Sequence, residues 1–152
     1  MALSAISPIL LVEDSPEDCE ATIRAIHKAE LSNPIVHCAS GDLALDYLHR
    51  RGAYTDPTIS PRPSLILLDL NLPGTDGRQV LEEIKAVPSL RPIPVIVFTT
   101  SADRRDIEAC YRAGANSYIQ KPVDLTSLLQ AVQRIKDFWF DMVIVPNVEE
   151  SR

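Results

Sequence analysis

Charged side chains that could carry chemistry stand directly after short apolar runs of this sequence: Glu13, Asp14, Asp69 and Lys121. If the runs are parallel strands, these side chains emerge at the carboxyl edge of one sheet, where open α/β sheets bind their ligands. Three carboxylates at one edge repel one another, so the site is expected to need a cation. The pattern indicates a divalent metal ion beside a reactive aspartate, with the lysine opposite.

The elements that must position these residues alternate regularly along the chain. Apolar runs predict strands at residues 8–12, 35–39, 64–68, 94–98 and 117–120. Helical patterns are predicted to begin at Ser15, Ser40, Asp76, Asp103 and Asp124. The order predicts an α/β fold, (βα)5, with a doubly wound parallel five-stranded sheet in the order 2-1-3-4-5. Its switch point, between the first and third strands, lies beside Glu13, Asp14 and Asp69.

Two segments depart from this regular pattern. Residues 51–63 contain a glycine and three prolines, which predict a loop longer than most helix-to-strand connections. The last helix keeps its apolar period as far as Trp139. We expect one domain over residues 1–140 and a tail over 141–152 that begins apolar and ends polar.

The bulk composition argues against several classes of protein. The chain has 152 residues, 45% hydrophobic and 24% charged, which is typical of one soluble globular domain. The net charge is −6 and no long run of Lys or Arg occurs, so nucleic-acid binding is not expected. Three cysteines without CxxC spacing favour a reducing cytoplasm. A basic n-region and a run of ~20 apolar residues are both lacking, so neither a signal peptide nor a membrane span is expected.

Four motifs, in this order, closely resemble the receiver domain of bacterial response regulators. They are Leu-Leu-Val-Glu-Asp at 10–14, Leu-Leu-Asp-Leu-Asn-Leu-Pro at 67–73 with Asp-Gly at 76–77, Val-Phe-Thr at 97–99, and Tyr-Ile-Gln-Lys-Pro at 118–122. Each motif alone is weak, whereas all four at strand ends are specific. The resemblance covers about residues 8–137 and implies a flavodoxin-like receiver fold.

The resemblance implies that Asp69 accepts a phosphoryl group from a histidine kinase, with Mg²⁺ as the cofactor. Asp14 would ligate the metal directly and Glu13 would hold one of its waters. Asp69 and the backbone carbonyl of Asn71 would be the other protein ligands. This agrees with the preference of Mg²⁺ for oxygen ligands, few carboxylates and several retained waters. Because such catalysis acts on the chain itself, the protein is not expected to be an enzyme.

Lys121 and Thr99 are expected, by the same resemblance, to contact the phosphoryl oxygens as a cation and a hydroxyl donor. Thr99 would then move toward the phosphate and Tyr118 would turn inward. This change would shift a two-state conformational equilibrium of the face made by helix four, strand five and helix five. Pro122 implies a cis Lys121–Pro122 bond that aims the lysine into the site.

The end of the chain carries more apolar side chains than one helix face can bury, which indicates an interface. No output domain follows the receiver pattern, so we expect signalling through protein contacts. We expect a homodimer through helix five and residues 138–146, with Phe138, Trp139 and Ile144 in the contact. The alternative is that this tail folds back on its own domain.

The long loop, the Leu-Asn-Leu-Pro segment and the Phe-Trp tail ending in Pro146 resemble one subgroup of response regulators. These are the small single-domain regulators partnered with phytochromes in cyanobacteria and other bacteria. That resemblance implies a red/far-red photoreceptor histidine kinase as the phosphodonor, and a homodimer.

Three other functions compete with this interpretation. A haloacid-dehalogenase-like phosphatase needs a second acid two residues after its aspartate, where this chain has Asn71. A flavodoxin-like carrier needs a Ser/Thr-rich phosphate loop after the first strand, where this chain has Glu13-Asp14-Ser15-Pro16. A receiver-fold adaptor that works without phosphorylation is the remaining alternative.

Overall fold

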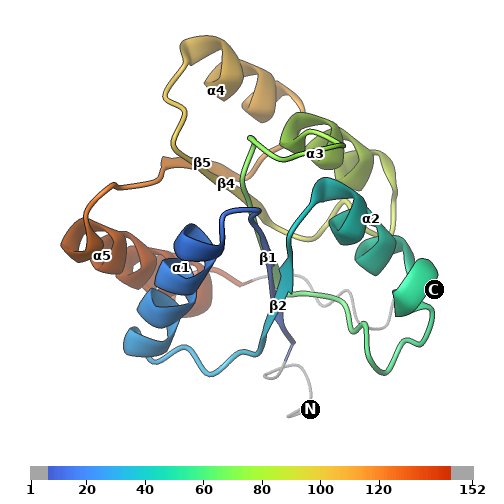
Figure 1. Cartoon of the computed structure of the whole chain (residues 1–152), viewed down its shortest axis with the longest axis horizontal. Coiled ribbons are helices and arrows are strands. Elements are labelled where there is room, and N and C mark those ends of the chain that lie inside the picture. Colours follow the sequence, from blue (N-terminus) through green and yellow to red (C-terminus); the bar gives the residue numbers. More distant parts are fainter. Residues whose placement is uncertain (1–6, 145–152) are drawn as a thin grey trace.

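The alternation of strands and helices is present in the computed structural model, which describes residues 7–144 (Figure 1). The strands are β1 Ile9–Val12, β2 Ile35–Cys38, β3 Leu65–Leu68, β4 Val95–Thr99 and β5 Ser117–Gln120. The helices are α1 Pro16–Lys28, α2 Gly41–His49, α3 Gly77–Ala86, α4 Arg104–Arg112 and α5 Leu125–Ile135. A 3-10 turn, η2, spans Gly52–Tyr54, and a π-helical turn, η3, spans Lys136–Phe140.

All five strands are parallel and lie in the order β2-β1-β3-β4-β5, so the predicted (βα)5 topology is confirmed. Val12 pairs with Cys38 on one side and with Leu68 on the other. The pairing continues one residue further, because the amide of Asp69 donates to the carbonyl of Val12 at 3.0 Å. The amide of Glu13 likewise donates to the carbonyl of Cys38 at 3.1 Å. The ends of β1 and β3 are therefore level.

Helices cover both faces of the sheet, α1 and α5 on one and α2, α3 and α4 on the other (Figure 1). Successive strand residues alternate between the two faces. Leu10 and Ile66 pack in the cluster under α2, α3 and α4, whereas Leu11 and Leu67 pack under α1 and α5. The strands β1, β3 and β4 are buried at every position, which explains why their sequences are continuously apolar.

Side-chain caps set the starts of the helices as the sequence predicted. The hydroxyl of Ser15 accepts from the amide of Asp18 at 3.2 Å, and Pro16 occupies the first helical position of α1. The predicted caps Ser40 and Asp124 also accept backbone hydrogen bonds, and so does Asp103 at the predicted start of α4. The first turn of α1 is thereby fixed next to the end of β1.

The predicted loop over residues 51–63 is docked against the end of α2, where the Tyr47 hydroxyl donates to the carbonyl of Pro61 at 2.5 Å and Nε of Arg50 donates to the carbonyl of Ser60 at 3.2 Å. It contains the η2 turn, and Ser60 within it is fully buried. The Ser60 hydroxyl contacts the carbonyl oxygens of Tyr54 at 3.0 Å and Asp56 at 2.9 Å. These contacts satisfy polar backbone groups that the docked loop would otherwise leave unpaired.

The α-helical part of the last helix is shorter than its apolar period predicted. The α-helix ends at Ile135 and the π turn follows, which rotates the aromatic side chains relative to a regular helix. Trp139 and Phe140 pack against the core cluster under α1 and α5. Phe138 is 49% exposed and Ile144 is 96% exposed. The tail therefore folds back in part and presents other apolar side chains to solvent. Within residues 7–144, no helix is both long and apolar enough to cross a bilayer.

Candidate functional site

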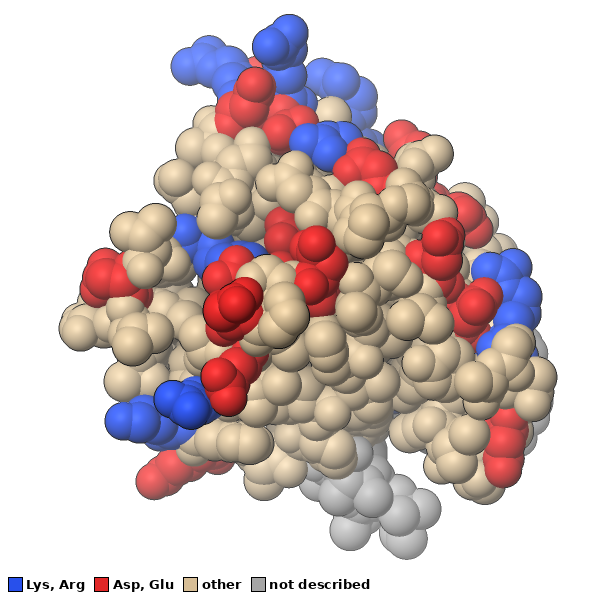
Figure 2. Space-filling model, in the orientation of Figure 1, with Lys and Arg blue, Asp and Glu red and all other residues tan. Residues whose placement is uncertain are grey.

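Three carboxylates predicted at the carboxyl edge of the sheet lie together there. Glu13, Asp14 and Asp69 each offer one oxygen, and these oxygens all lie within 4.8 Å of one another. Glu13 is 3% exposed and Asp69 is 7% exposed, whereas Asp14 is open to solvent. Acidic side chains gather over the start of α1, near the centre of the face in Figure 2. The structure thus brings the predicted acidic residues into one site.

Lys121 places a cation against this acidic cluster. Its ammonium hydrogen-bonds to Oε1 of Glu13 and lies 3.5 Å from Oδ2 of Asp69. It also contacts Oδ2 of Asp18, on the first turn of α1, at 3.4 Å. The lysine side chain is only 5% exposed. Lys121 therefore connects β5 to the ends of β1 and β3.

The Lys121–Pro122 peptide bond is trans, so the predicted cis bond is wrong. The Lys121 amide donates to the carbonyl of Thr99 at 2.6 Å, which continues the β4–β5 pairing to the edge of the sheet. From this position the long lysine side chain reaches Glu13 without a cis bond. A trans X-Pro bond is intrinsically favoured by about 0.5–1 kcal/mol.

Burial and charge act in opposite directions on this buried ion pair. Burial is the largest influence on Glu13 and raises its pKa, and the Asp69 charge adds to the rise while the Lys121 hydrogen bond opposes it. Burial also disfavours the charge on Lys121, but the carboxylates of Glu13, Asp69 and Asp18 together outweigh it and raise the lysine pKa. Lys121 is accordingly a cation at neutral pH.

The chemistry of the donor set fits a hard divalent cation. Glu13, Asp14 and Asp69 supply the carboxylate oxygens that Mg²⁺ and similar ions prefer. The exposed side of Asp14 leaves space for the water ligands that Mg²⁺ retains. The amide of Asn71 donates to Oδ1 of Asp69 at 3.3 Å, so the backbone of Asn71 lies beside the cluster. One lysine does not balance three carboxylates, and a bound cation would.

Helix α3 begins in contact with the turn that follows Asp69. The amide of Gly77 donates to the carbonyl of Leu70 at 3.1 Å. A Cβ atom at position 77 would lie 2.3 Å from the carbonyl oxygen of Asp69 and 2.6 Å from Cα of Leu70. Glycine is therefore required here by close backbone approach, and this approach fixes the turn that carries Asp69.

Thr99 ends β4 at the same edge of the sheet. It is 0% exposed, and its hydroxyl has no hydrogen-bond partner among the residues that the structure describes. Leaving a buried hydroxyl unpaired costs about 1–3 kcal/mol, so such a group calls for an explanation. An anionic oxygen bound at this edge would supply the missing acceptor.

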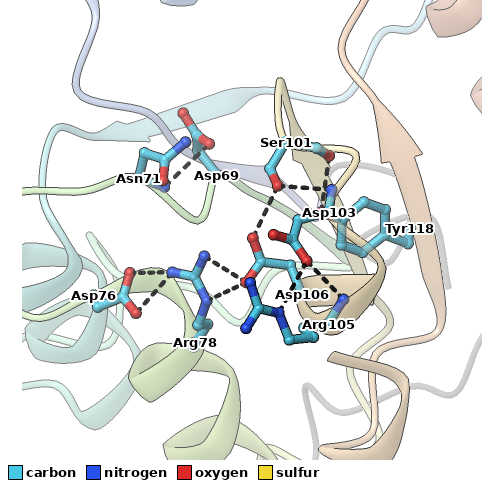
Figure 3. Close-up of polar contacts among 9 residues, drawn as sticks. All are labelled: Asp69, Asn71, Asp76, Arg78, Ser101, Asp103, Arg105, Asp106 and Tyr118. Atoms are coloured by element: carbon cyan, nitrogen blue, oxygen red, sulfur yellow. Dashed lines mark hydrogen bonds and ion pairs between the residues drawn. The ribbon is translucent and has the colours of Figure 1, made fainter. Parts of the chain in front are cut away.

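A chain of polar contacts joins α3, α4 and β5 (Figure 3). The hydroxyl of half-buried Tyr118 donates to the carbonyl of Ser101 at 2.9 Å, and the hydroxyl of Ser101 donates to Oδ2 of Asp106 at 2.8 Å. Arg78 joins Asp106 to Asp76 at the start of α3. Sequence reasoning found Tyr118 but missed the Arg78–Asp106 pair. The opposite charges near two helix starts were visible, but nothing in the sequence showed that these helix starts approach each other.

The parallel sheet with its acidic cluster and opposing lysine defines a receiver domain. The family model of the response regulator receiver domain matches residues 9–133, and the chain belongs to this family. Response regulator Rcp1 of Synechocystis sp. is 42% identical over 138 residues, which cover 91% of this chain and 92% of that protein. The predicted family and fold are therefore confirmed.

Solved structures give the same result. The Mn²⁺-bound form of response regulator Rcp1 superposes with a TM-score of 0.85 at 41% identity, over 93% of this chain and 99% of that chain. The phosphorylated cyanobacterial phytochrome response regulator RcpA superposes with a TM-score of 0.87 at 40% identity, with the same coverage of both chains. Two-component signalling is the function of this class of protein.

Proposed function

We propose that this chain accepts a phosphoryl group on Asp69 from a histidine kinase and signals the change through protein contacts. The observation that carries the proposal is the placement of Asp69. Its carboxylate is nearly buried, lies in a three-carboxylate cluster with Glu13 and Asp14, and faces the ammonium of Lys121 at 3.5 Å. This surrounds one aspartate with the charges that phosphoryl transfer requires.

In the proposed reaction the phosphoryl group passes from an imidazole nitrogen of the kinase to a carboxylate oxygen of Asp69. A P–O bond forms while the P–N bond breaks, and the imidazole leaves with the electron pair. Lys121 neutralises part of the charge on the phosphoryl oxygens, and the Thr99 hydroxyl, which has no partner within residues 7–144, donates to one of them. Asn71 orients the acceptor through its hydrogen bond to Oδ1 of Asp69.

Mg²⁺ is the proposed cofactor, and it would supply the additional positive charge at the phosphoryl oxygens. Asp14 and Asp69 would hold it directly, Glu13 would hold one of its waters, and the backbone carbonyl of Asn71 would complete the protein ligands. Support comes from the oxygen-only donor set of the cluster and from the Mn²⁺-bound crystal form of Rcp1.

The proposed phosphodonor is a phytochrome-type photoreceptor histidine kinase in the cytoplasm. RcpA is described as a cyanobacterial phytochrome response regulator, and RtBRR, at 36% identity and a TM-score of 0.75, as a bacteriophytochrome response regulator. The cysteines Cys19, Cys38 and Cys110 are buried free thiols, which supports a reducing compartment. Catalysis in this proposal is confined to the protein's own phosphorylation and dephosphorylation.

The proposed output involves a homodimer through α5 and the tail. Phe138 and Ile144 support it, because both are apolar and exposed at the end of the described chain. Trp139 lies between its own core and the surface, with its ring edge-on to Phe138 at 5.4 Å between centroids. It would stiffen the contact surface rather than lie at its centre.

The test is intact mass spectrometry after incubation with acetyl phosphate and Mg²⁺. We expect one labile phosphoryl adduct, lost in Asp69→Asn and in the metal-free protein. Asp56→Asn is the matched control, since Asp56 lies in the loop that enters β3 from the opposite edge of the sheet. This variant should keep the adduct. No adduct on the unmodified chain would overturn the proposal and favour the phosphorylation-independent adaptor.

A further inference from the structure

Lys121 has a carboxylate partner that phosphoryl transfer to Asp69 does not call for. Besides Glu13 and Asp69, its ammonium lies 3.4 Å from Oδ2 of Asp18. Glu13 and Asp69 belong to the three-carboxylate cluster, and Asp18 does not. We propose that Asp18 is a positioning residue, which holds the ammonium of Lys121 at the mouth of the site and thereby sets the rate of phosphoryl acceptance. This inference rests on the proposed role of Asp69.

The local structure of α1 places Asp18 where this contact requires it. The Ser15 cap accepts from the Asp18 amide, so the backbone of Asp18 is fixed in the first helical turn. Its side chain is 45% exposed, whereas that of Lys121 is 5% exposed. Asp18 is thus the most solvent-exposed of the three carboxylates that contact the ammonium of Lys121.

The separation of Asp18 from the cluster gives it a distinct role. A cation held by Asp14 and Asp69, with Glu13 on one of its waters, would compete with Lys121 for the oxygens of Glu13 and Asp69, because both positive charges would lie within a few ångströms of these carboxylates. Asp18 offers no oxygen to the cluster and stays available to Lys121. A lysine side chain is long and flexible, so an anchor outside the cluster pre-positions its charge for the transferred group.

The first test measures the rate of adduct formation with acetyl phosphate and Mg²⁺ in Asp18→Asn, Asp18→Glu and Glu17→Gln. Glu17→Gln is the matched control, since Glu17 is an exposed acid of the same helical turn and accepts its hydrogen bond from the Ser15 hydroxyl. We expect Asp18→Asn to lower the maximal rate by about tenfold, less than the ~100-fold that a 1 Å misplacement of a catalytic group can cost, because Glu13 and Asp69 still hold the ammonium of Lys121. Asp18→Glu should restore part of the rate, and Glu17→Gln should leave it unchanged.

The second test needs neither metal nor phosphate. The ammonium signal of Lys121 is observed by ¹⁵N NMR in the metal-free protein. Asp18→Asn should shift it or broaden it by faster exchange with water, and Glu17→Gln should leave it in place. A merely structural role for Asp18 in α1 would move neither the signal nor the rate beyond the effect of Glu17→Gln.

Three outcomes overturn the inference: an Asp18→Asn rate equal to that of Glu17→Gln, a faster rate in Asp18→Asn, or an unmoved Lys121 signal. A chain that takes up no phosphoryl group at all instead overturns the proposed function. The two failures are distinguishable because the unmodified protein is measured alongside each variant.

Discussion

The guanidinium of Arg78 donates two hydrogen bonds to Oδ1 of Asp106, from Nε at 2.9 Å and from Nη2 at 2.8 Å (Figure 3). Arg78 stands in the first turn of α3, immediately after the glycine that packs on the Asp69 turn. Asp106 stands in the first turn of α4 and accepts a hydrogen bond from Ser101. The pair thus ties the candidate phosphoacceptor turn to the region that carries the proposed switch.

This ion pair predicts a pH dependence of stability. Hydrogen bonds from Arg78 and Ser101 hold the pKa of Asp106 below its usual range. The unfolded chain therefore takes up the proton first as the pH falls, so the stabilisation is present above about pH 4 and is lost as acid protonates the folded carboxylate. Asp106→Asn should cost about 1 kcal/mol at pH 7, because partial exposure screens the pair. Urea unfolding of both proteins from pH 7 to pH 3 should show the difference disappear, and a constant difference would contradict this.

Metal removal predicts a second stability effect. Bound Mg²⁺ should stabilise the folded protein by about 2.7 kcal/mol at a hundred times its dissociation constant, and EDTA should abolish the gain. Asp14→Asn should show little gain with Mg²⁺. Its metal-free form should unfold no more easily than the wild type, because one of three like charges is gone. Thermal unfolding with and without Mg²⁺ measures both effects, and exposed Glu82→Gln is the control that should gain like the wild type.

Replacing Thr99 by valine should change stability and reactivity in opposite directions. Thr99→Val removes a buried hydroxyl without a partner in the described structure and should raise the free energy of unfolding of the unphosphorylated protein by about 1 kcal/mol. It should also slow phosphoryl acceptance, since the donor is lost. Thr99→Ser keeps the donor but loses a buried methyl, so it should cost about 0.8 kcal/mol and keep more of the reactivity. Equal reactivity of the two variants would remove Thr99 from the proposed mechanism.

Activation should change the side-chain rotamer of Tyr118. In the unphosphorylated structure its hydroxyl donates to the Ser101 carbonyl, two residues beyond Thr99. A shift of Thr99 toward a bound phosphate mimic should carry Ser101 with it, break this bond and change the Tyr118 rotamer. Structures with and without the mimic test this. Tyr54, which packs edge-on against Tyr47 at 5.2 Å, is the internal reference that should stay in place. If Tyr118 keeps the same rotamer with and without the phosphate mimic, its proposed role in the switch is wrong.

The tail predicts how the oligomer responds to substitution. Ile144→Asp puts a charge on a side chain that is 96% exposed in the single chain, so folding should be unaffected. If residues 138–146 form the dimer contact, sedimentation should show a monomer, and Phe138→Ala should weaken the dimer. Ile59→Asp, at a 59% exposed position in the long loop, should leave the dimer intact. Trp139 variants are less informative, because that ring also packs on its own core.

The sheet and the main site were predictable because both depend on short-range rules. Continuous apolar runs mark strands buried on both faces, and a residue directly after a parallel strand must emerge at its carboxyl edge. Asp69 and Lys121 were placed by that rule alone. Ser15 was placed by its cap, which also set the first turn of α1.

Contacts between elements distant in sequence could not be predicted in the same way. The Asp18–Lys121 and Arg78–Asp106 pairs depend on where helices settle against the sheet, and no periodicity encodes that. The apolar spacing of the sequence after Ile135 also fits a regular α-helix, so the sequence did not predict the π turn. In the structure, the turn is accompanied by the packing of Trp139 on the core. The cis bond was predicted from resemblance rather than from the residues, and it was wrong.

The close approach at Gly77 has a consequence for any mutational scan of this protein. A side chain there would be forced 2.3 Å from the carbonyl oxygen of Asp69, so nearly every substitution should score as inactive in a selection for signalling. In a selection table Gly77 would thus rank with Asp69 itself, although it donates nothing to the phosphoryl group. Intolerance at position 77 would reflect a steric clash with the backbone rather than the loss of a catalytic group. A parallel screen for folded protein would distinguish the two causes.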